Sequence, residues 1–148
     1  SLAAVEHLVW IGKTMAHEYH EQFTGYSEST KYIYSAMTAI KDYEEKLSYR
    51  LINGLQAIKG IKVKGITQTE QMHHRVPTVC FIHQDYDSEE IAALLAEKSI
   101  FVWSGVFYAI EIIKKLGLDK SSGLVRVGTA HYNTIEEIDI FLEALANL

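Results

Sequence analysis

Arg126 is the residue whose type and setting most clearly permit binding chemistry. It stands between Val125 and Val127 in a short apolar stretch that predicts a β-strand. Because side chains alternate along a strand, the guanidinium is expected to point away from both valines. Its planar, permanently charged fork matches a carboxylate or a phosphate through two parallel hydrogen bonds. The sequence therefore predicts a small anion as its partner, with a solvated arginine or one half of a structural ion pair as the alternative.

The segment after this strand predicts a turn and a capped helix. Asn133 is a turn residue, and Thr134 and Glu137 have the spacing of a capping box, in which the hydroxyl caps the helix and the carboxylate reaches back. His131 lies in the same connection. It is a candidate to line a pocket near Arg126, although a histidine at such a place is also a common turn residue.

Four aromatic residues lie in the segments that precede and follow the Arg126 strand: Trp103, Phe107, Tyr108 and Tyr132. They fit either core packing or the apolar wall of a substrate pocket. Ser104 and Gly105 are predicted to open a helix, whose free N–H groups would attract an anion. The sequence thus gives Arg126 a set of candidate neighbours.

The single cysteine and the histidines give weaker indications. Cys80 lies among apolar residues and cannot form an internal disulfide, so a buried thiol in a reducing compartment is expected rather than a nucleophile. His17 and His20 stand three residues apart, which permits a shared helix face, but the sequence suggests no third ligand. We expect a solvated surface there and no metal, and an exposed pair at His73 and His74.

The composition limits the functions open to the chain. It has 148 residues, of which 48% are hydrophobic, enough for one compact domain with its own core. A net charge of −5 without any run of lysine or arginine argues against nucleic acid and anionic membrane surfaces as partners. No apolar stretch approaches the ~20 residues that span a bilayer, and the start does not resemble a targeting segment. A cytoplasmic protein is expected.

Helical periodicity governs the first half of the chain. Apolar residues recur at helical spacing from Leu2 to about Phe23, a polar turn is expected over 24–30, and a long helix over 31–59 ends at Gly60. A helix of ~29 residues reaches ~40 Å, more than one small core covers evenly, so we expect it to bridge two domains. Because the amphipathic pattern is already running at Leu2, the chain is expected to be a C-terminal portion of a larger protein.

The second half predicts a small α/β unit, a few strands with helices on one face. The expected strands cover residues 61–64, 76–82, 99–103 and 124–128, and the expected helices cover 88–98, 105–116 and the residues from 135 onward. Pro77 has no N–H to donate, so the second strand is expected to lie at a sheet edge or to begin there.

Three ordered segments carry a resemblance to a known family. They are Val125 to Asp139, Ile100 to Ala109 followed by Leu116 to Leu118, and Arg75 to Phe81. In this order they resemble class V aminotransferases, and in particular the cysteine desulfurase-like branch, enzymes that use pyridoxal phosphate (PLP). The resemblance implies that Arg126 holds the α-carboxylate of an amino-acid substrate.

The resemblance also implies a fold and a domain plan. Residues 1–28 would be the tail of the large PLP domain, 29–60 the linking helix, and 61–148 the small C-terminal α/β domain of a fold-type I enzyme, with a mainly antiparallel sheet. In the family the lysine, aspartate and phosphate cup that hold PLP lie in the large domain, and neither Lys13 nor Lys31 has that context. We therefore expect PLP and a homodimer for the whole enzyme, and no bound cofactor or PLP chemistry for the chain alone.

Two positions depart from the cysteine desulfurases. Tyr108 aligns with the cysteine that accepts sulfur in those enzymes, and Trp103 replaces an arginine that is usual before the glycine of the same loop. A tyrosine cannot form a persulfide, and Cys80 lies on another strand. Ordinary desulfuration is therefore not expected. The alternative from another class of protein is a free-standing α/β module without catalysis, which either binds a small carboxylate through Arg126 or has a regulatory role.

Overall fold

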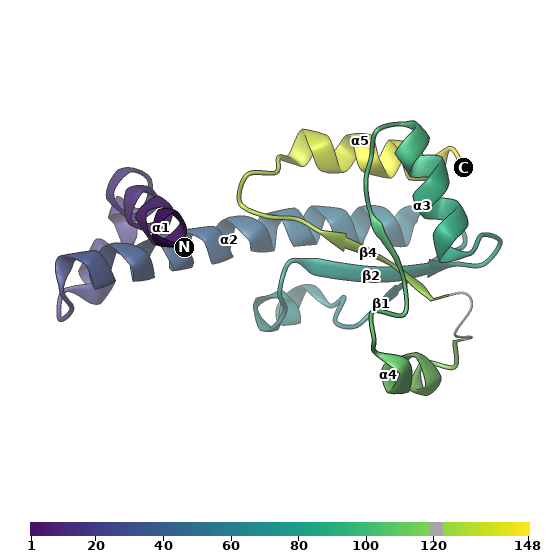
Figure 1. The fold of residues 1–148 in the computed structure, drawn as a ribbon, viewed down its shortest axis with the longest axis horizontal. Coiled ribbons are helices and arrows are strands. Elements are labelled where there is room, and N and C mark those ends of the chain that lie inside the picture. Colours follow the sequence, from purple (N-terminus) through teal and green to yellow (C-terminus); the bar gives the residue numbers. More distant parts are fainter. Residues whose placement is uncertain (119–122) are drawn as a thin grey trace. The chain divides into compact units, whose positions relative to one another are not determined.

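The computed structural model describes residues 1–118 and 123–148, which form two compact units, Ser1–Glu44 and Glu45–Leu148. The long helix α2 (Glu28–Ala57) gives its first part to unit 1 and its last part to unit 2 (Figure 1). Within the described residues, no helix is both long enough and apolar enough to cross a membrane.

Unit 1 contains a break that the sequence pattern does not reveal. The periodicity predicts one helix as far as Phe23. In the structure, however, α1 (Leu2–Thr14) ends at Thr14, and a 3-10 helix, η1 (His17–Phe23), follows it. The backbone leaves the helical region at Met15 and Ala16, where φ is −125° and −121°. Ala16 is fully buried. Packing of this small side chain thus overrides a continuous helical period.

The contact between α1 and α2 in unit 1 depends on the missing side chain of Gly12. A Cβ at Gly12 would overlap the backbone carbonyl of Tyr32. Helix propensity alone would favour Gly12→Ala by up to ~1 kcal/mol. The obstacle is backbone that cannot rotate away, so we expect Gly12→Ala to destabilise unit 1 by about 1–3 kcal/mol. Faster hydrogen exchange of the amides of residues 1–44 would measure this loss.

Gly25→Ala is the matched control for this prediction. No atom lies within 4 Å of the position that a Cβ at Gly25 would take. The amides of residues 1–44 in the Gly25→Ala variant should therefore exchange as in the unchanged protein. Equal protection in the Gly12 and Gly25 variants would contradict the steric argument.

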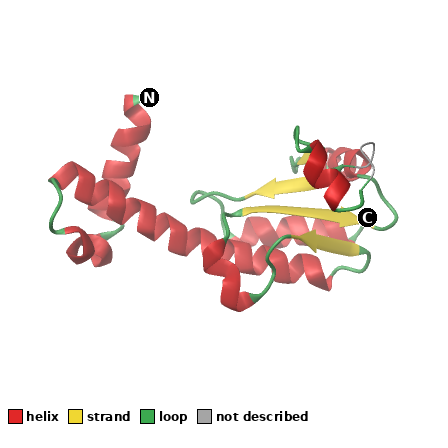
Figure 2. Ribbon diagram, turned by 90° about the horizontal axis from the view of Figure 1, so that it is seen from below, coloured by secondary structure: helices red, strands yellow, loops and turns green. Residues whose placement is uncertain are grey.

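Unit 2 is built on a four-stranded antiparallel sheet (Figure 2) with the order β1-β2-β4-β3. The strand bounds are Ile61–Lys64 for β1, Thr78–His83 for β2, Trp103–Gly105 for β3 and Leu124–Gly128 for β4. β2 lies inside the sheet, so Pro77 does not mark an edge strand. Pro77 stands just before the first ladder pair, Thr78 with Gly128, where its missing N–H is tolerated. The predicted α/β class and mainly antiparallel sheet are confirmed.

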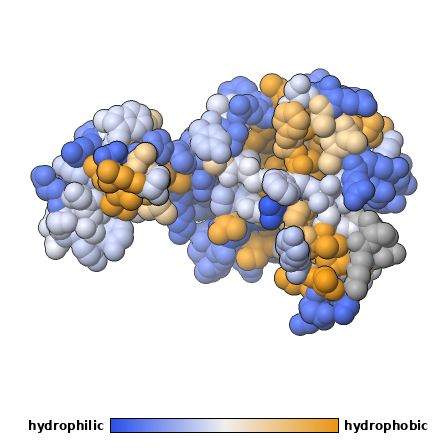
Figure 3. All heavy atoms as spheres, in the orientation of Figure 1, coloured by the Kyte–Doolittle hydropathy of each residue, from blue (hydrophilic) through white to orange (hydrophobic). Residues whose placement is uncertain are grey.

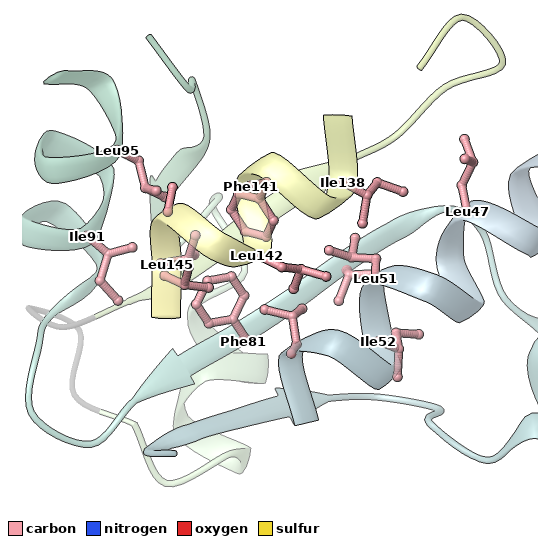
Figure 4. Close-up of a cluster of buried hydrophobic side chains, with 14 of the residues drawn as sticks. Leu47, Leu51, Ile52, Phe81, Ile91, Leu95, Ile138, Phe141, Leu142 and Leu145 are labelled. Carbon is pink, nitrogen blue, oxygen red and sulfur yellow. The ribbon is translucent and has the colours of Figure 1, made fainter. Parts of the chain in front are cut away.

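Three helices of unit 2 pack on one face of this sheet: the last part of α2, α3 (Ser88–Glu97) and α5 (Ile135–Ala146). Their apolar side chains meet the inward residues of β2 and β4 in a single core (Figure 4). Its most deeply buried members include Leu47, Leu51, Leu55, Val79, Phe81, Ile91, Leu95 and Val125. A 3-10 helix, η2 (Thr69–His74), adds Met72.

The capping box predicted at the start of α5 is confirmed. The Glu137 N–H donates to Thr134 Oγ1 at 3.2 Å, and the Thr134 N–H donates to Glu137 Oε2 at 3.0 Å. A second capping box, formed by Asp87 and Glu90, opens α3. Both helices therefore start where local chemistry satisfies their first N–H groups.

The segment between α3 and β4 differs most from the prediction. β3 begins at Trp103, where the predicted strand would end, and the helix predicted over 105–116 shrinks to α4 (Ile110–Lys115). Within the predicted helix 105–116, three residues have a positive φ, which an α-helix does not contain: Gly105 (117°), Phe107 (51°) and Tyr108 (57°). Apolar side chains gather over α4 (Figure 3), and Ile112 remains 58% exposed.

Candidate functional site

The face of the sheet opposite the helices, which we call the open face, holds the candidate site. Strand alternation and register place four side chains in one row on it: Lys64 of β1, Cys80 of β2, Arg126 of β4 and Trp103 of β3. Directly opposed residues on neighbouring strands have Cβ atoms about 4.5–5.5 Å apart. None of the strand residues is Asp or Glu, so the row is cationic.

Two aromatic rings contact the guanidinium of Arg126. Its Cζ lies 5.5 Å from the ring centre of Trp103 and 4.5 Å from that of Phe107, both within cation–π range. Among residues 1–118 and 123–148, no carboxylate forms an ion pair with this guanidinium, and no hydrogen bond from it is found. The structural ion pair that the sequence left open is therefore not present in the described part of the chain.

A tight turn brings Phe107 to Arg126. The Ala109 N–H donates to the Val106 carbonyl oxygen at 2.8 Å, and the two residues between them, Phe107 and Tyr108, both have positive φ. This is the φ pattern of a type I′ turn, which favours Asn-Gly. A left-handed φ in a bulky residue costs on the order of 1–3 kcal/mol and tends to occur at functional sites. The turn leaves Tyr108 fully exposed.

Three other predicted site residues, Ser104, Gly105 and His131, lie in β3 and in the turn after β4. Ser104 pairs with a core residue of β4, so its side chain lies on the helix-covered face, away from Arg126. The prediction that Ser104 and Gly105 open a helix is wrong, because both belong to β3 and offer no helix N-terminus to an anion. His131 lies in the turn after β4, where its ring meets that of Tyr132 at 5.5 Å.

Cys80 lies close to two arginines on the open face. Arg126 is its ladder partner, and Arg75 is held near the start of β2 by hydrogen bonds to the carbonyl oxygens of Ile66, Val76 and Thr78. Burial raises the pKa of the Cys80 thiol, and the charges of Arg126 and Arg75 only partly offset that rise. Burial also lowers the pKa of Arg75. The thiol is therefore protonated near neutral pH.

Cys80 is expected to react slowly with iodoacetamide near neutral pH, because a raised pKa leaves little thiolate. Arg126→Met removes a positive charge at similar volume, so it should raise the pKa further and slow the reaction again. The pH dependence of alkylation, followed by mass spectrometry, measures both effects. Alkylation as fast as that of a small free thiol would contradict the assignment.

The raised pKa of the Cys80 thiol also links folding stability to pH. The protonated thiol stabilises the folded state below its ordinary pKa, and this contribution is lost as pH rises through the pKa of the thiol in the folded state.

The sequence did not reveal how two residues contribute to this site. Phe107 was predicted only as a core residue or part of a pocket wall, and its contact with Arg126 was not predicted, because the pattern from 105 to 116 predicts a helix and the turn has no glycine at its two central positions. The sequence gives only a weak indication that Arg75 belongs to the site, because it shows no more than a charged residue shortly before Pro77 and the beginning of a strand. Its three bonds to carbonyl oxygens appear only in the folded chain.

The described residues do not assemble a metal centre. No group of three or more His, Cys, Asp or Glu side chains within them could hold an ion. The rings of His17 and His20 meet edge-on at 5.1 Å, and His20 Nε2 lies 2.7 Å from the Gly12 carbonyl oxygen. His73 and His74 contact each other at 3.9 Å between ring centres.

The model of the class-V aminotransferase family matches residues 19–141 of this chain. The chain belongs to the class-V aminotransferase family. It is 38% identical over 109 residues to an aminotransferase-like protein of Gibberella zeae, covering 72% of this chain and 27% of that protein. It is 31% identical over 107 residues to a probable cysteine desulfurase of Pseudomonas putida, covering 72% of this chain and 24% of that one.

The likeness extends to the fold. An apo structure of a cysteine desulfurase from Thermococcus onnurineus matches with a TM-score of 0.68 at 27% identity, covering 81% of this chain and 29% of the other. The predicted resemblance to the cysteine desulfurase-like branch and to its fold is thus confirmed. The chain spans about a quarter of the length of the relatives it matches.

Enzymes of this family depend on PLP. The cofactor needs a lysine for its aldehyde and a carboxylate for its ring nitrogen. The open face offers Lys62 and Lys64, yet its strands contain no acidic residue. In unit 1, Lys13 lies over the ring of Tyr32. No reaction step through PLP follows from these residues.

Proposed function

We propose that this chain supplies the carboxylate-binding site of a PLP-dependent class-V aminotransferase that acts on an amino acid. Arg126 binds the α-carboxylate of the substrate, and the exposed rings of Trp103 and Tyr108 line its approach. The observation that carries this proposal is an arginine on the open face of a rigid sheet without an acidic partner among the described residues. A permanently charged fork in that state favours a carboxylate ligand.

The role proposed for Arg126 is orientation. Two parallel hydrogen bonds fix both the position and the rotation of a carboxylate. A substrate held in this way has already lost much of the freedom that it must lose before it reacts. When bound to an enzyme of this family, PLP supplies the electron sink. In this proposal, the chain itself supplies the residue that orients the substrate, Arg126.

We extend the proposal to the organisation of the enzyme. Residues 1–28 belong to the large PLP domain, 29–60 form the linking helix, and 61–148 form the small domain, while the residues that hold PLP lie outside the described part of the chain. The sharing of α2 between two compact units supports a linking role for this helix. The enzyme is a cytoplasmic homodimer, as is common among enzymes of this fold, and the chain alone is inactive.

The proposal does not include ordinary desulfuration. Tyr108 occupies the position that resembles the sulfur-accepting cysteine, and it is fully exposed at a turn. Cys80 is fixed within the ladders of β2, between β1 and β4, and its thiol pKa is raised. Neither residue has the accessible thiolate that sulfur transfer requires.

A comparison of L-alanine with L-alaninamide tests the carboxylate site. Both have the same side chain and amino group, but the amide lacks the negative charge. In an enzyme that contains this chain and PLP, a titration followed by cofactor absorbance should give a much lower dissociation constant for L-alanine. Equal dissociation constants would contradict the proposed function. The 148-residue chain alone should not bind PLP.

A further inference from the structure

We propose that Trp103 and Phe107 are positioning residues, whose rings hold the guanidinium of Arg126 in place of an acidic partner and leave its N–H groups free for a ligand. This inference rests on the proposed function, because the ligand is the carboxylate that Arg126 would bind. It adds that the binding geometry of Arg126 exists before the ligand arrives.

The first ring is placed by the sheet itself. Trp103 is the ladder partner of Arg126 in the β3–β4 pair, so both side chains project from the same face. The indole remains 68% exposed, and its ring centre lies 5.5 Å from the guanidinium carbon. Hydrophobic burial therefore does not explain why this side chain lies beside the arginine.

The second ring is placed by the strained turn. Phe107 approaches more closely, with 4.5 Å from its ring centre to Arg126 Cζ. It reaches this position only because the backbone of Phe107 and Tyr108 adopts a left-handed φ, where glycine or asparagine would be favoured. Glycine at position 107 would relieve the strain and lose the ring. The sequence keeps the ring, which indicates that its contact with Arg126 matters.

The chemistry of the contact differs from that of an ion pair. A guanidinium carries its five N–H donors in one plane and accepts nothing. A carboxylate partner would occupy those donors in the plane, whereas a ring face attracts the charge without using an N–H group. An arginine held by rings therefore keeps its full capacity for a two-point carboxylate bond. Among the described residues, Arg126 has this arrangement, while Arg50 pairs with Asp139.

The side-chain Nε–H signals of arginine test the inference directly. The chain has only three arginines, so a ¹H–¹⁵N spectrum of the protein holds three such signals. Ring currents should displace the signal of Arg126 from its ordinary position. Phe107→Leu removes one ring and should move the Arg126 signal toward its ordinary position. Phe107→Tyr keeps a ring at this place and should leave the signal displaced. The signals of Arg50 and Arg75, held by an ion pair and by carbonyl groups, report that the fold is intact.

Two results would overturn the positioning role. One is an Arg126 signal at its ordinary position in the unchanged protein. The other is an Arg126 signal that does not move in either Phe107→Leu or Trp103→Leu while the two control signals stay in place.

Binding separates this inference from the proposed function. In an enzyme that contains this chain and PLP, Phe107→Leu should weaken L-alanine binding about three- to tenfold, in line with the strength of a cation–π contact, and Phe107→Tyr should not. If L-alanine binding requires Arg126 but is unchanged in Phe107→Leu, the positioning role is wrong and the proposed function stands. If the ring-current displacement behaves as expected but Arg126 has no effect on L-alanine binding, the proposed function is wrong and the rings still position Arg126.

Discussion

Replacing Arg126 with alanine is expected to weaken the binding of an amino-acid substrate by about 2–5 kcal/mol, which is about 30-fold to several-thousand-fold in the dissociation constant. The cause is the loss of the two-point charge-assisted bond between the planar guanidinium and the substrate carboxylate. Substrate titrations of an enzyme that contains this chain and PLP measure the loss. The visible absorbance of the bound cofactor should persist, because Arg126 is not expected to contact it.

Two matched variants sharpen this prediction. Arg126→Lys keeps the charge but loses the planar fork, so it should recover only part of the affinity. Arg50→Ala removes an arginine whose partner, Asp139, lies on the helix-covered side and is 47% exposed. It should leave substrate affinity unchanged and alter stability by at most about 1 kcal/mol. Substrate binding as tight in Arg126→Ala as in the unchanged enzyme would refute the carboxylate assignment.

Replacing Phe81 with alanine is expected to destabilise unit 2 by about 3–5 kcal/mol. Phe81 is fully buried on β2, where it belongs to the core under α2, α3 and α5. Its removal costs the transfer free energy of the ring and leaves a cavity that strands and helices cannot close together. Denaturant unfolding followed by circular dichroism gives the change in the free energy of unfolding.

Phe101→Ala is the matched control for the core prediction. It removes the same atoms from a side chain that is 83% exposed, so the change should stay within about 0.5 kcal/mol. A similar loss of stability in both variants would show that the cost does not come from burial. Such a result would contradict the position of the core between the sheet and its three helices.

Much of the fold could be predicted from local pattern. The capping box of Thr134 and Glu137 satisfies N–H groups within one turn of helix, so its formation depends on four neighbouring residues. The strand Leu124–Gly128 follows from alternation over five residues. The orientation of Arg126, opposite to the core, follows from the same alternation. Such features are decided by interactions that are short in sequence.

Features that depend on distant residues could not be predicted. The break after α1 depends on the burial of Ala16, and the position of β2 inside the sheet depends on its pairing with β4, more than 40 residues further along the chain. The turn at Phe107 and Tyr108 contradicts local preference, since both residues disfavour a left-handed φ. Local rules fail at this turn because contacts elsewhere compensate its strain.

The sequence by itself determined that Arg126 would project from its strand on the face opposite to Val125 and Val127. Only the tertiary structure decided what surrounds that arginine: a ladder partner, Trp103, a ring from a strained turn, Phe107, and no acidic group among the described residues. The physical reason is that alternation is a property of one strand, whereas the partners of a side chain depend on the strands and turns that folding brings beside it.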